Sequence, residues 1–434
     1  MKFFQGKMFV ILCSLLVTGF AFATCASLYD YSANIETNNT DVELWIDSVS
    51  LKPFTKLEWQ DHQNESINRV RKRNIRIHVH EPAGTKAPRR ENRHRPNTAS
   101  FPARLQHNRN HLKPQGLPGL VHPTFHRDDV QQRNEMVLHG SPSDQENYTV
   151  PDAMVSFFKR HKISIRGHTI LWASTNVTQY WVRLLQPKDI LKAAVRRVGS
   201  VVSRYSGDVI GWDVMNENLH NSFYEEKLGP NASAMFYQIV RALDPNTPLF
   251  LNEYNTLEFP TDMNGHFLRT PKLSHMRATL DVLGATNMPI WLTELDTKRG
   301  PAQAVELEEI MREAFAHPAI EGIIVWGGWK PTGCNQTCLT NNNYDVLPKG
   351  CAEMCLTDNN FKNLPPGDVV DKLIKEWKTT NVTGVTNVDG VFEQNVFLGE
   401  YSVLVSHPMF PRRPVKKKFN VTNGKGPLEM WVSV

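Results

Sequence analysis

Two short segments of the sequence place carboxylate side chains where acid and base chemistry could occur. Residues 211–218 read Gly-Trp-Asp-Val-Met-Asn-Glu-Asn, an apolar run that ends in Asn216 and Glu217. Residues 290–296 read Ile-Trp-Leu-Thr-Glu-Leu-Asp, in which Glu294 ends a second run. Glycoside hydrolysis needs two carboxyl groups, one to protonate the leaving oxygen and one to attack or to activate water. Glu294 is therefore the candidate nucleophile and Glu217 the candidate acid/base; the alternative is two solvated carboxylates beside strand ends.

The elements that would position these residues alternate between helix and strand. Amphipathic periodicity predicts helices over 151–162, 187–205, 232–243, 271–283, 302–315 and 367–378. Short apolar runs predict strands over 163–172, 209–216, 248–254, 289–295 and 320–326. This succession predicts an α/β fold with a parallel sheet and right-handed crossovers. Because the polar residues follow strand ends, a (β/α)8 TIM barrel fits better than an open sheet.

Composition and charge exclude several function classes. With 40% hydrophobic and 21% charged residues, the 434-residue chain is a globular protein rather than a disordered one. A net charge of +5 is too small to indicate a nucleic-acid partner. No glycine-rich phosphate loop follows a strand, and no strand-end lysine suggests Schiff-base chemistry.

The charge is concentrated in one stretch. Residues 69–113 contain thirteen Lys or Arg and two acidic residues, a local charge of +11. With almost no apolar periodicity there, we predict an exposed basic linker over 61–118; contact with acidic cell-wall polymers or with anionic surfaces is the alternative.

The N-terminus has the pattern of a secretory signal. Lys2 and Lys7 precede an apolar run over 8–20 and the small-residue site Ala-Phe-Ala at 21–23. The run is shorter than the ~20 residues of a membrane anchor, which is the alternative. We predict a signal over 1–23, a secreted extracellular or cell-wall protein, and no membrane contact after cleavage. Eight glycosylation sequons agree with secretion: they begin at Asn38, Asn64, Asn147, Asn176, Asn231, Asn335, Asn381 and Asn420.

Four late cysteines lie in an internal repeat with an offset of 17 residues. The repeat contains two Cys-x3-Cys pairs, Cys334 with Cys338 and Cys351 with Cys355. An oxidising compartment favours disulfides over the zinc alternative, and the sequence leaves three connectivities open.

Several motifs resemble family 10 of the glycoside hydrolases, the endo-1,4-β-xylanases, and look most like its plant members. They are Arg-Gly-His-Thr-Ile-Leu-Trp at 166–172, Trp-Asp-Val-Met-Asn-Glu at 212–217, Leu-Asn-Glu-Tyr-Asn at 251–255 and Trp-Leu-Thr-Glu-Leu-Asp at 291–296. The resemblance covers about 134–434. Residues 42–55 alternate apolar and polar side chains and resemble the last strand of a family-22 carbohydrate-binding module. The implied domains are a module remnant over 24–60, the barrel over 119–380 and a β-rich tail over 381–434.

The resemblance also implies roles for single residues. Glu217 would be the acid/base and Glu294 the nucleophile, while Asn216 would bond the sugar 2-hydroxyl. His266 would orient the nucleophile with Asp296 as its partner. The other implied substrate-binding residues are Asn134, His168, Trp172, Asn264 and Trp326. The alternatives are plain structural roles, since buried histidines and tryptophans are common in protein cores.

The sequence also departs from the family pattern. Val137 and Leu138 stand where the family has a sugar-binding Lys and its Trp, and Asn264 replaces a Gln. Residues after Phe101, where the first barrel strand would lie, are basic and do not read as a buried parallel strand. Only 13 residues run from Glu253 to His266, too few for a loop, a crossover helix and a strand. We therefore expect an incomplete barrel.

The expected function is endo-hydrolysis of 1,4-β-xylosidic linkages in xylan with retention of configuration. No metal and no organic cofactor are expected, and the chain should be a monomer whose partner is xylan or a related β-1,4-linked polysaccharide. The alternative is a catalytically weak or inactive carbohydrate-binding protein derived from such an enzyme.

Overall fold

The computed structural model describes residues 55–80, 102–107, 146–254, 256–257, 273–297, 300–326, 328, 354–358, 360–407 and 410–434, with backbone alone at 102–107 and 410–413. The chain divides into two compact units, 1–62 and 63–434, and the contacts reported below lie within the second. The predicted signal, Val137, Leu138 and all but Thr55 of the strand-like segment over 42–55 lie outside the described residues. None of the described helices combines the length and the apolar character that a membrane crossing requires.

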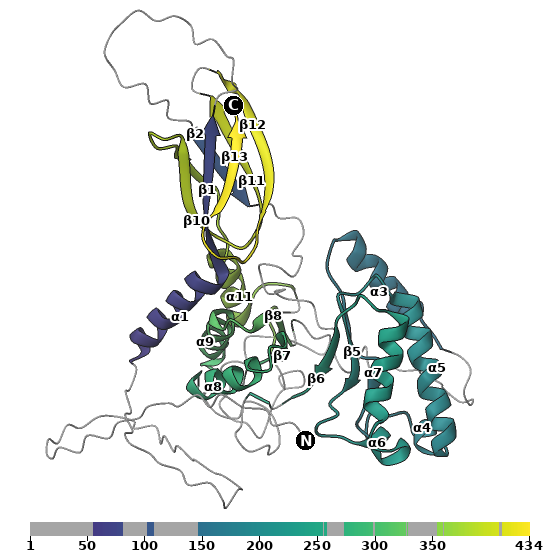
Figure 1. The fold of residues 1–434 in the computed structure, drawn as a ribbon. Helices are drawn as coiled ribbons and strands as arrows, with labels where there is room; N and C mark the ends of the chain where they lie inside the picture. The colour runs from purple at the N-terminus through teal and green to yellow at the C-terminus, as the bar shows by residue number, and fades with distance from the viewer. Residues whose placement is uncertain are drawn as a thin grey trace, which may run out of the picture. The chain divides into compact units, whose positions relative to one another are not determined.

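Residues 146–254 form a parallel sheet with helices packed along it (Figure 1). The strands are β3 (Arg166–Gly167), β4 (Leu171–Trp172), β5 (Gly211–Asn216) and β6 (Leu249–Asn252). The helices are α3 (Thr149–Arg160), α4 (Tyr180–Arg183), α5 (Pro187–Tyr205), α6 (Phe223–Leu228) and α7 (Ala232–Leu243). Every residue of β5 is buried, as expected for a central strand of a parallel sheet.

The strand predicted over 163–172 is interrupted. β3 pairs with the start of β5 and β4 with its end, both parallel, while β6 pairs with β5 along its other edge. β3 and β4 therefore act as one broken strand. Their carboxyl end lies at the same edge of the sheet as those of β5 and β6.

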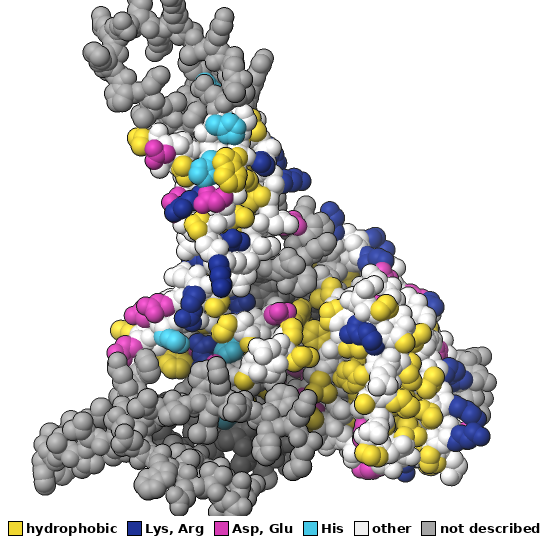
Figure 2. Space-filling view, viewed as in Figure 1, with side chains coloured by type: hydrophobic (Ala, Val, Ile, Leu, Met, Phe, Trp, Pro, Cys, Tyr) yellow, Lys and Arg dark blue, Asp and Glu magenta, His cyan; other side chains and the backbone are white. Residues whose placement is uncertain are grey.

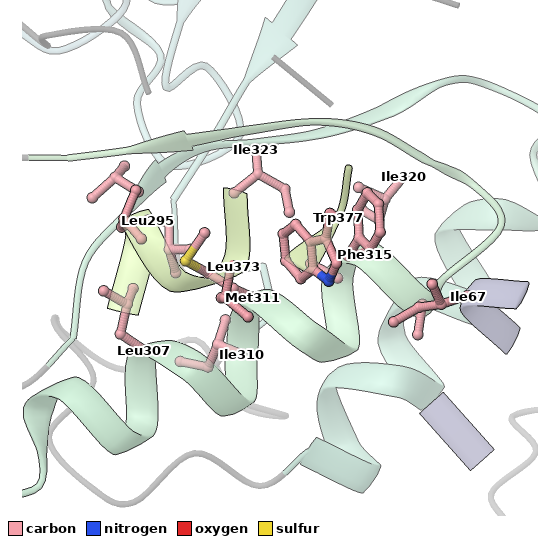
Figure 3. Packing of buried hydrophobic residues seen from close by; sticks show 14 of the residues in the cluster. Ile67, Leu295, Leu307, Ile310, Met311, Phe315, Ile320, Ile323, Leu373 and Trp377 are labelled. Carbon is pink, nitrogen blue, oxygen red and sulfur yellow. The ribbon is translucent and has the colours of Figure 1, made fainter. Parts of the chain in front are cut away.

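A second group of elements follows along the chain. It contains α8 (Leu273–Gly284), β7 (Ile290–Leu295), α9 (Gln303–Ala316), β8 (Ile320–Val325) and α11 (Pro365–Glu376). β7 and β8 are parallel neighbours. Leucine, isoleucine and methionine side chains of these elements fill a common core, in which the rings of Phe315 and Trp377 stack 3.9 Å apart (Figure 3).

Helix α1 (Lys56–Arg71) adds its last turns to this core. Ile67 packs into the apolar cluster, and Gln63 Nε2 donates to Glu313 Oε2 at 2.8 Å. Arg71 is buried and donates to the backbone carbonyls of Phe315, His317 and Ile320, each at 2.7 Å. Arg71 thus satisfies carbonyl groups at and beyond the C-terminus of α9 that the helix itself leaves unpaired.

The parallel strands do not close into a barrel among the described residues. β6 belongs to the sheet of β5, whereas β7 pairs with β8 in a separate two-stranded sheet. The expected eight-stranded barrel is therefore present only as two α/β groups, which agrees with the predicted incompleteness. Residues 253–272 alone separate β6 from α8. The expectation of a missing crossover and strand rests on the 13 residues from Glu253 to His266, since a parallel crossover alone needs a dozen or more.

The third part of the fold is a pair of β-sheets that joins both ends of the described chain (Figure 1). One sheet has the order β10-β1-β13 and the other β12-β11-β2-β9. The strands are β1 (Lys72–His80), β2 (Pro102–His107), β9 (Val382–Val385), β10 (Val391–Phe397), β11 (Gly399–His407), β12 (Phe410–Val421) and β13 (Leu428–Ser433). Residues of both sheets, among them Ile77, Val396 and Val403, share one hydrophobic cluster.

The prediction of a linker over 61–118 does not hold where the structure describes it. β1 runs antiparallel to β10 and parallel to β13, and β2 lies antiparallel to both β11 and β9. The sequence pattern that indicated strand β1 is the alternation of Ile75, Ile77 and Val79 with polar residues, and these three side chains are buried. The high local charge hid this alternation because the basic side chains occupy the outer positions of the strand. The absence of a buried parallel strand after Phe101 is confirmed, since β2 is antiparallel.

Candidate functional site

The carboxyl ends of β4, β5, β6 and β7 carry the residues that the sequence singled out. Trp172 ends β4, Asn216 ends β5 with Glu217 directly after it, and Asn252 ends β6. Glu294 is the last residue but one of β7. Hydrogen bonds connect these strand ends, so the two glutamates belong to one site.

Glu217 is held by its backbone and by its side chain. Its N–H donates to the carbonyl of Asn252 at 3.0 Å, and its φ is 57°, a value that non-glycine residues rarely adopt. Trp172 Nε1 donates to Oε2 of Glu217 at 2.8 Å. A rare backbone conformation at a strand end, fixed from two sides, is typical of functional sites.

Asn252 connects the two glutamates. Its Nδ2 donates to Glu294 Oε1 at 2.7 Å and to Asn216 Oδ1 at 2.8 Å. Its Oδ1 accepts from Arg166 Nη2 at 2.9 Å and from Thr293 Oγ1 at 2.6 Å. Both N–H groups and both lone pairs of the amide are used, which fixes the amide and places a donor on the Glu294 carboxylate.

The side-chain amide of Asn216 uses its oxygen in a hydrogen bond but not its nitrogen. Its side chain is buried, and its Oδ1 accepts the bond from Asn252. Its Nδ2 is buried and has no hydrogen-bond partner among the described residues. A buried donor without an acceptor costs free energy, so this group is suited to a ligand oxygen that completes it.

His168 and Arg166 share a buried aspartate. Asp213 is fully buried on β5; its Oδ2 contacts His168 Nδ1 at 2.7 Å, and its Oδ1 accepts from Arg166 Nη2. Burial lowers the pKa of His168, but the hydrogen bond to Asp213 and the charges of Asp213 and Glu294 outweigh it, so the pKa of His168 is raised overall. The imidazole is thus held partly buried with a preference for its charged form.

Two tryptophans flank this imidazole. The ring of His168 lies edge-on to Trp172 at 6.0 Å and to Trp326 at 6.5 Å between centroids. Trp326 follows β8, and its N–H donates to the carbonyl of Leu295 at 2.8 Å. Both tryptophans are half-buried, so each keeps a part of its surface exposed and is not purely a core residue.

Comparisons with known proteins give the same family. The profile of glycosyl hydrolase family 10 matches residues 124–264. Endo-1,4-beta-xylanase 5 of Arabidopsis thaliana is 32% identical over 428 residues, which cover 90% of this chain and 72% of that protein. Endo-1,4-beta-xylanase 5-like of the same plant is 33% identical, with 89% and 71% covered. The chain belongs to glycosyl hydrolase family 10.

One solved structure to which the chain is similar is a xylanase 10B from Thermotoga petrophila RKU-1 in complex with xylobiose. It is 17% identical, covers 59% of this chain and 86% of that chain, and has a TM-score of 0.46.

The structure brings together part of the predicted family 10 site. Glu217, Glu294, Asn216, His168, Trp172 and Trp326 are connected by the contacts above. Asp296 follows β7 and is half-buried, but its expected partner His266 lies outside the described residues, as do Asn134 and Asn264.

The cysteine prediction is confirmed at one position. Cys355 is disulfide-bonded, whereas Cys334, Cys338 and Cys351 lie outside the described residues, so the connectivity stays open. Within the described ranges there is no group of three side chains that could hold a metal ion.

Three site residues were missed by reasoning from the sequence: Arg166, Asp213 and Asn252. Asp213 offered a signal, because a carboxylate inside an apolar strand must be paired when buried. Arg166 lies on the neighbouring strand β3, and His168 follows directly after that strand. For Asn252 the only indication in the sequence was its position at a strand end. Its bond to Glu294 depends on how the two sheets meet, which the sequence does not state.

Proposed function

We propose that this family 10 member hydrolyses internal β-1,4-xylosidic bonds of xylan by a retaining double displacement. The observation that carries the proposal is the Asn252 amide, which links the strand-end residues of β5 to Glu294. The substrate class rests on the relatives, which are endo-1,4-beta-xylanases by name.

In the first step Glu294 attacks the anomeric carbon, and the bond to the leaving sugar oxygen breaks. Glu217 gives that oxygen its proton, so a glycosyl ester on Glu294 and a free sugar hydroxyl are formed. The Asn252 Nδ2 donates to Glu294 Oε1, which holds this carboxylate in one orientation for its attack. A retaining pair requires carboxyl groups about 5 to 5.5 Å apart.

In the second step Glu217 acts as base. It removes a proton from water, the water oxygen attacks the same carbon, and the bond to Glu294 breaks with retention of configuration. The indole N–H of Trp172 donates to Glu217 Oε2, which leaves Oε1 as the oxygen that gives and takes the proton. The buried Nδ2 of Asn216 supplies a donor for the sugar 2-hydroxyl, and His168 with its two flanking tryptophans forms a wall for the sugar ring.

The decisive experiment separates the two carboxylates. Glu294→Ala should abolish turnover of xylan and of aryl xylobiosides, because no covalent intermediate can form. Glu217→Ala should abolish xylan hydrolysis but spare aryl xylobiosides with a good leaving group, which need no protonation in the first step. The exposed Glu226→Ala on α6 is the control and should behave as wild type. Full xylan activity in Glu294→Ala would overturn the assignment.

The proposal includes secretion to the cell wall as a monomeric glycoprotein. Its support is that the described sequon asparagines are exposed, namely Asn64, Asn147, Asn176, Asn231, Asn381 and Asn420. N-terminal sequencing of the secreted protein should start after Ala23, and glycosidase treatment should lower its mass. An intact N-terminus in cytosolic protein would contradict this part.

A further inference from the structure

The outer face of the sheet β10-β1-β13 carries an exposed tryptophan in a polar setting. Trp431 on β13 is 57% exposed. The face around it, here the Trp431 face, consists of Asn74, Arg76, His78, Glu393, Glu429 and Trp431. Figure 2 shows histidine, acidic, basic and hydrophobic side chains gathered on this sheet. These positions alternate with the buried Ile75, Ile77 and Val79 of β1, so they point away from the core.

The indole of Trp431 is held in place on one side. Its register neighbour on β1 is His78, and the two rings stack with centroids 5.0 Å apart and planes at 11°. His78 Nε2 in turn lies 2.6 Å from Glu429 Oε2, which fixes the imidazole. Because β13 is an edge of the described sheet, the indole face turned away from β1 is the accessible one. A fixed ring loses little conformational entropy when a ligand stacks on it.

Hydrogen-bonding groups lie in rows beside the ring. Arg76 sits between two carboxylates, with Nε 3.3 Å from Glu393 Oε1 and Nη1 3.6 Å from Glu429 Oε1. Asn74 Nδ2 donates to the same Glu393 oxygen. The carboxylates and cations of this face pair with one another, so the face offers donors and acceptors without a strong net charge. That balance disfavours nucleic acid, an acidic peptide or an anionic membrane as the occupant.

We propose that the Trp431 face is a second binding site for a chain of β-1,4-linked pyranose residues. A β-linked pyranose presents axial C–H groups on its ring faces and equatorial hydroxyls at its rim. The C–H face covers the accessible side of the indole, whose π face is electron-rich. The rim hydroxyls meet the carboxylate of Glu429, which lies two positions before Trp431 on the same strand. That the polymer is xylan rests on the proposed function, but the fit to a neutral pyranose chain does not.

Such a site acts by local concentration. One stacked sugar ring binds weakly, but a polymer attached at the Trp431 face keeps other parts of the same chain near the protein. The site therefore matters for long or insoluble polysaccharide and not for short substrates.

The test uses the full chain with Glu294→Ala, so that polymer is not degraded during adsorption. Adding Trp431→Ala should weaken adsorption to insoluble xylan about tenfold, which corresponds to roughly 1.4 kcal/mol. Adding Trp431→Phe, which keeps an aromatic face, should restore most of it. The matched control is Val385→Ala on β9, a side chain 60% exposed on the other sheet, which should leave adsorption unchanged.

A second measurement separates this site from catalysis. In the chain with Glu294 intact, Trp431→Ala should leave turnover of an aryl xylobioside unchanged and slow release of sugar from insoluble xylan. If the chain hydrolyses nothing but still loses adsorption with Trp431→Ala, the proposed function fails and the second site stands. If Trp431→Ala adsorbs as the control does, or changes self-association instead, the second site is overturned.

Discussion

At the scale of single residues, the site depends on an amide rather than on a further charge. Asn252 uses all four of its hydrogen-bonding positions, two of them on Asn216 and Glu294. An amide can donate to a carboxylate without changing the charge of the site, whereas a lysine or arginine would neutralise the nucleophile. Asn252 is therefore a positioning residue, because it acts on the sugar through Glu294.

Replacing Asn252 should slow the chemical step more than it weakens binding. Asn252→Ala removes the donor from the charged Glu294, a hydrogen bond worth about 1.5 to 3 kcal/mol, so kcat should fall roughly 10- to 150-fold with little change in KM. Steady-state kinetics on an aryl xylobioside measure this. Asn360→Ala, an exposed asparagine outside the site, is the control and should match wild type. A change confined to KM would argue that Asn252 contacts substrate instead.

His168 should make stability depend on pH. Its pKa is raised in the folded chain because the Asp213 bond and the charges of Asp213 and Glu294 outweigh burial. A histidine of this kind contributes stability that is fully present below its unfolded pKa of about 6.5 and is lost as the pH rises through the folded value. His168→Gln should therefore lower the free energy of unfolding more at about pH 5.5 than at about pH 9, measured with urea. Asp213→Asn should remove most of this difference, and equal losses at both pH values would contradict the pairing.

At the scale of elements, the long helices of the α/β part were well predicted from sequence, whereas α1, α4 and α6 were not predicted. The bounds of α5 and α7 match the predicted ranges to the residue, because Pro187 fixes the start of α5 and long amphipathic periodicity defines both. β1 was missed because a charge count over many residues hides a short alternation. The break between β3 and β4 and the Asn252 bonds follow from tertiary contacts, which no local pattern encodes.

One contact between elements should dominate the stability of the second α/β group. Burial lowers the pKa of Arg71 to about 10 against the opposing charge of Glu321, and its guanidinium bonds three carbonyls. Arg71→Met keeps the aliphatic part but leaves those carbonyls without their donor, so the free energy of unfolding should fall by about 2 to 4 kcal/mol. Arg69→Met, at an exposed position on the same helix, should change it by less than about 0.5 kcal/mol. Chemical denaturation of both variants checks this, and similar losses would show that the carbonyl bonds are unimportant.

At the scale of the whole molecule, side-chain hydrogen bonds connect the two parallel sheets. In a closed barrel, backbone hydrogen bonds would join the strands all the way round. Thr293 and Glu294 of β7 bond to Asn252 of β6, but no backbone ladder joins the two strands. Backbone pairing across a sheet holds strand ends more rigidly than a few side-chain bonds do. Site geometry is therefore less firmly fixed than in a closed barrel.

Completing the barrel should raise activity. Inserting a crossover helix and a strand from a complete family member after Leu257 should increase xylan turnover by about 10- to 100-fold, since a misplacement of about 1 Å at a catalytic group costs that much. Reducing-sugar release by the two proteins at equal concentration measures the gain. A flexible Gly-Ser insertion of equal length is the control and should give none. If the unmodified chain already equals a complete relative, the shortened segment is not a defect.

The paired sheets have a consequence for synthesis on the ribosome. β1 emerges early, yet the strands that flank it, β10 and β13, lie in the last 44 residues of the chain. The row Ile75, Ile77 and Val79 must therefore stay uncovered while more than 300 residues are translated, and a strand with an open edge is prone to wrong pairing. Because these contacts are so distant in sequence, their formation is slow as well as late. We expect nascent chains to require a chaperone on this segment until the final strand, which ends at Ser433, has left the exit tunnel.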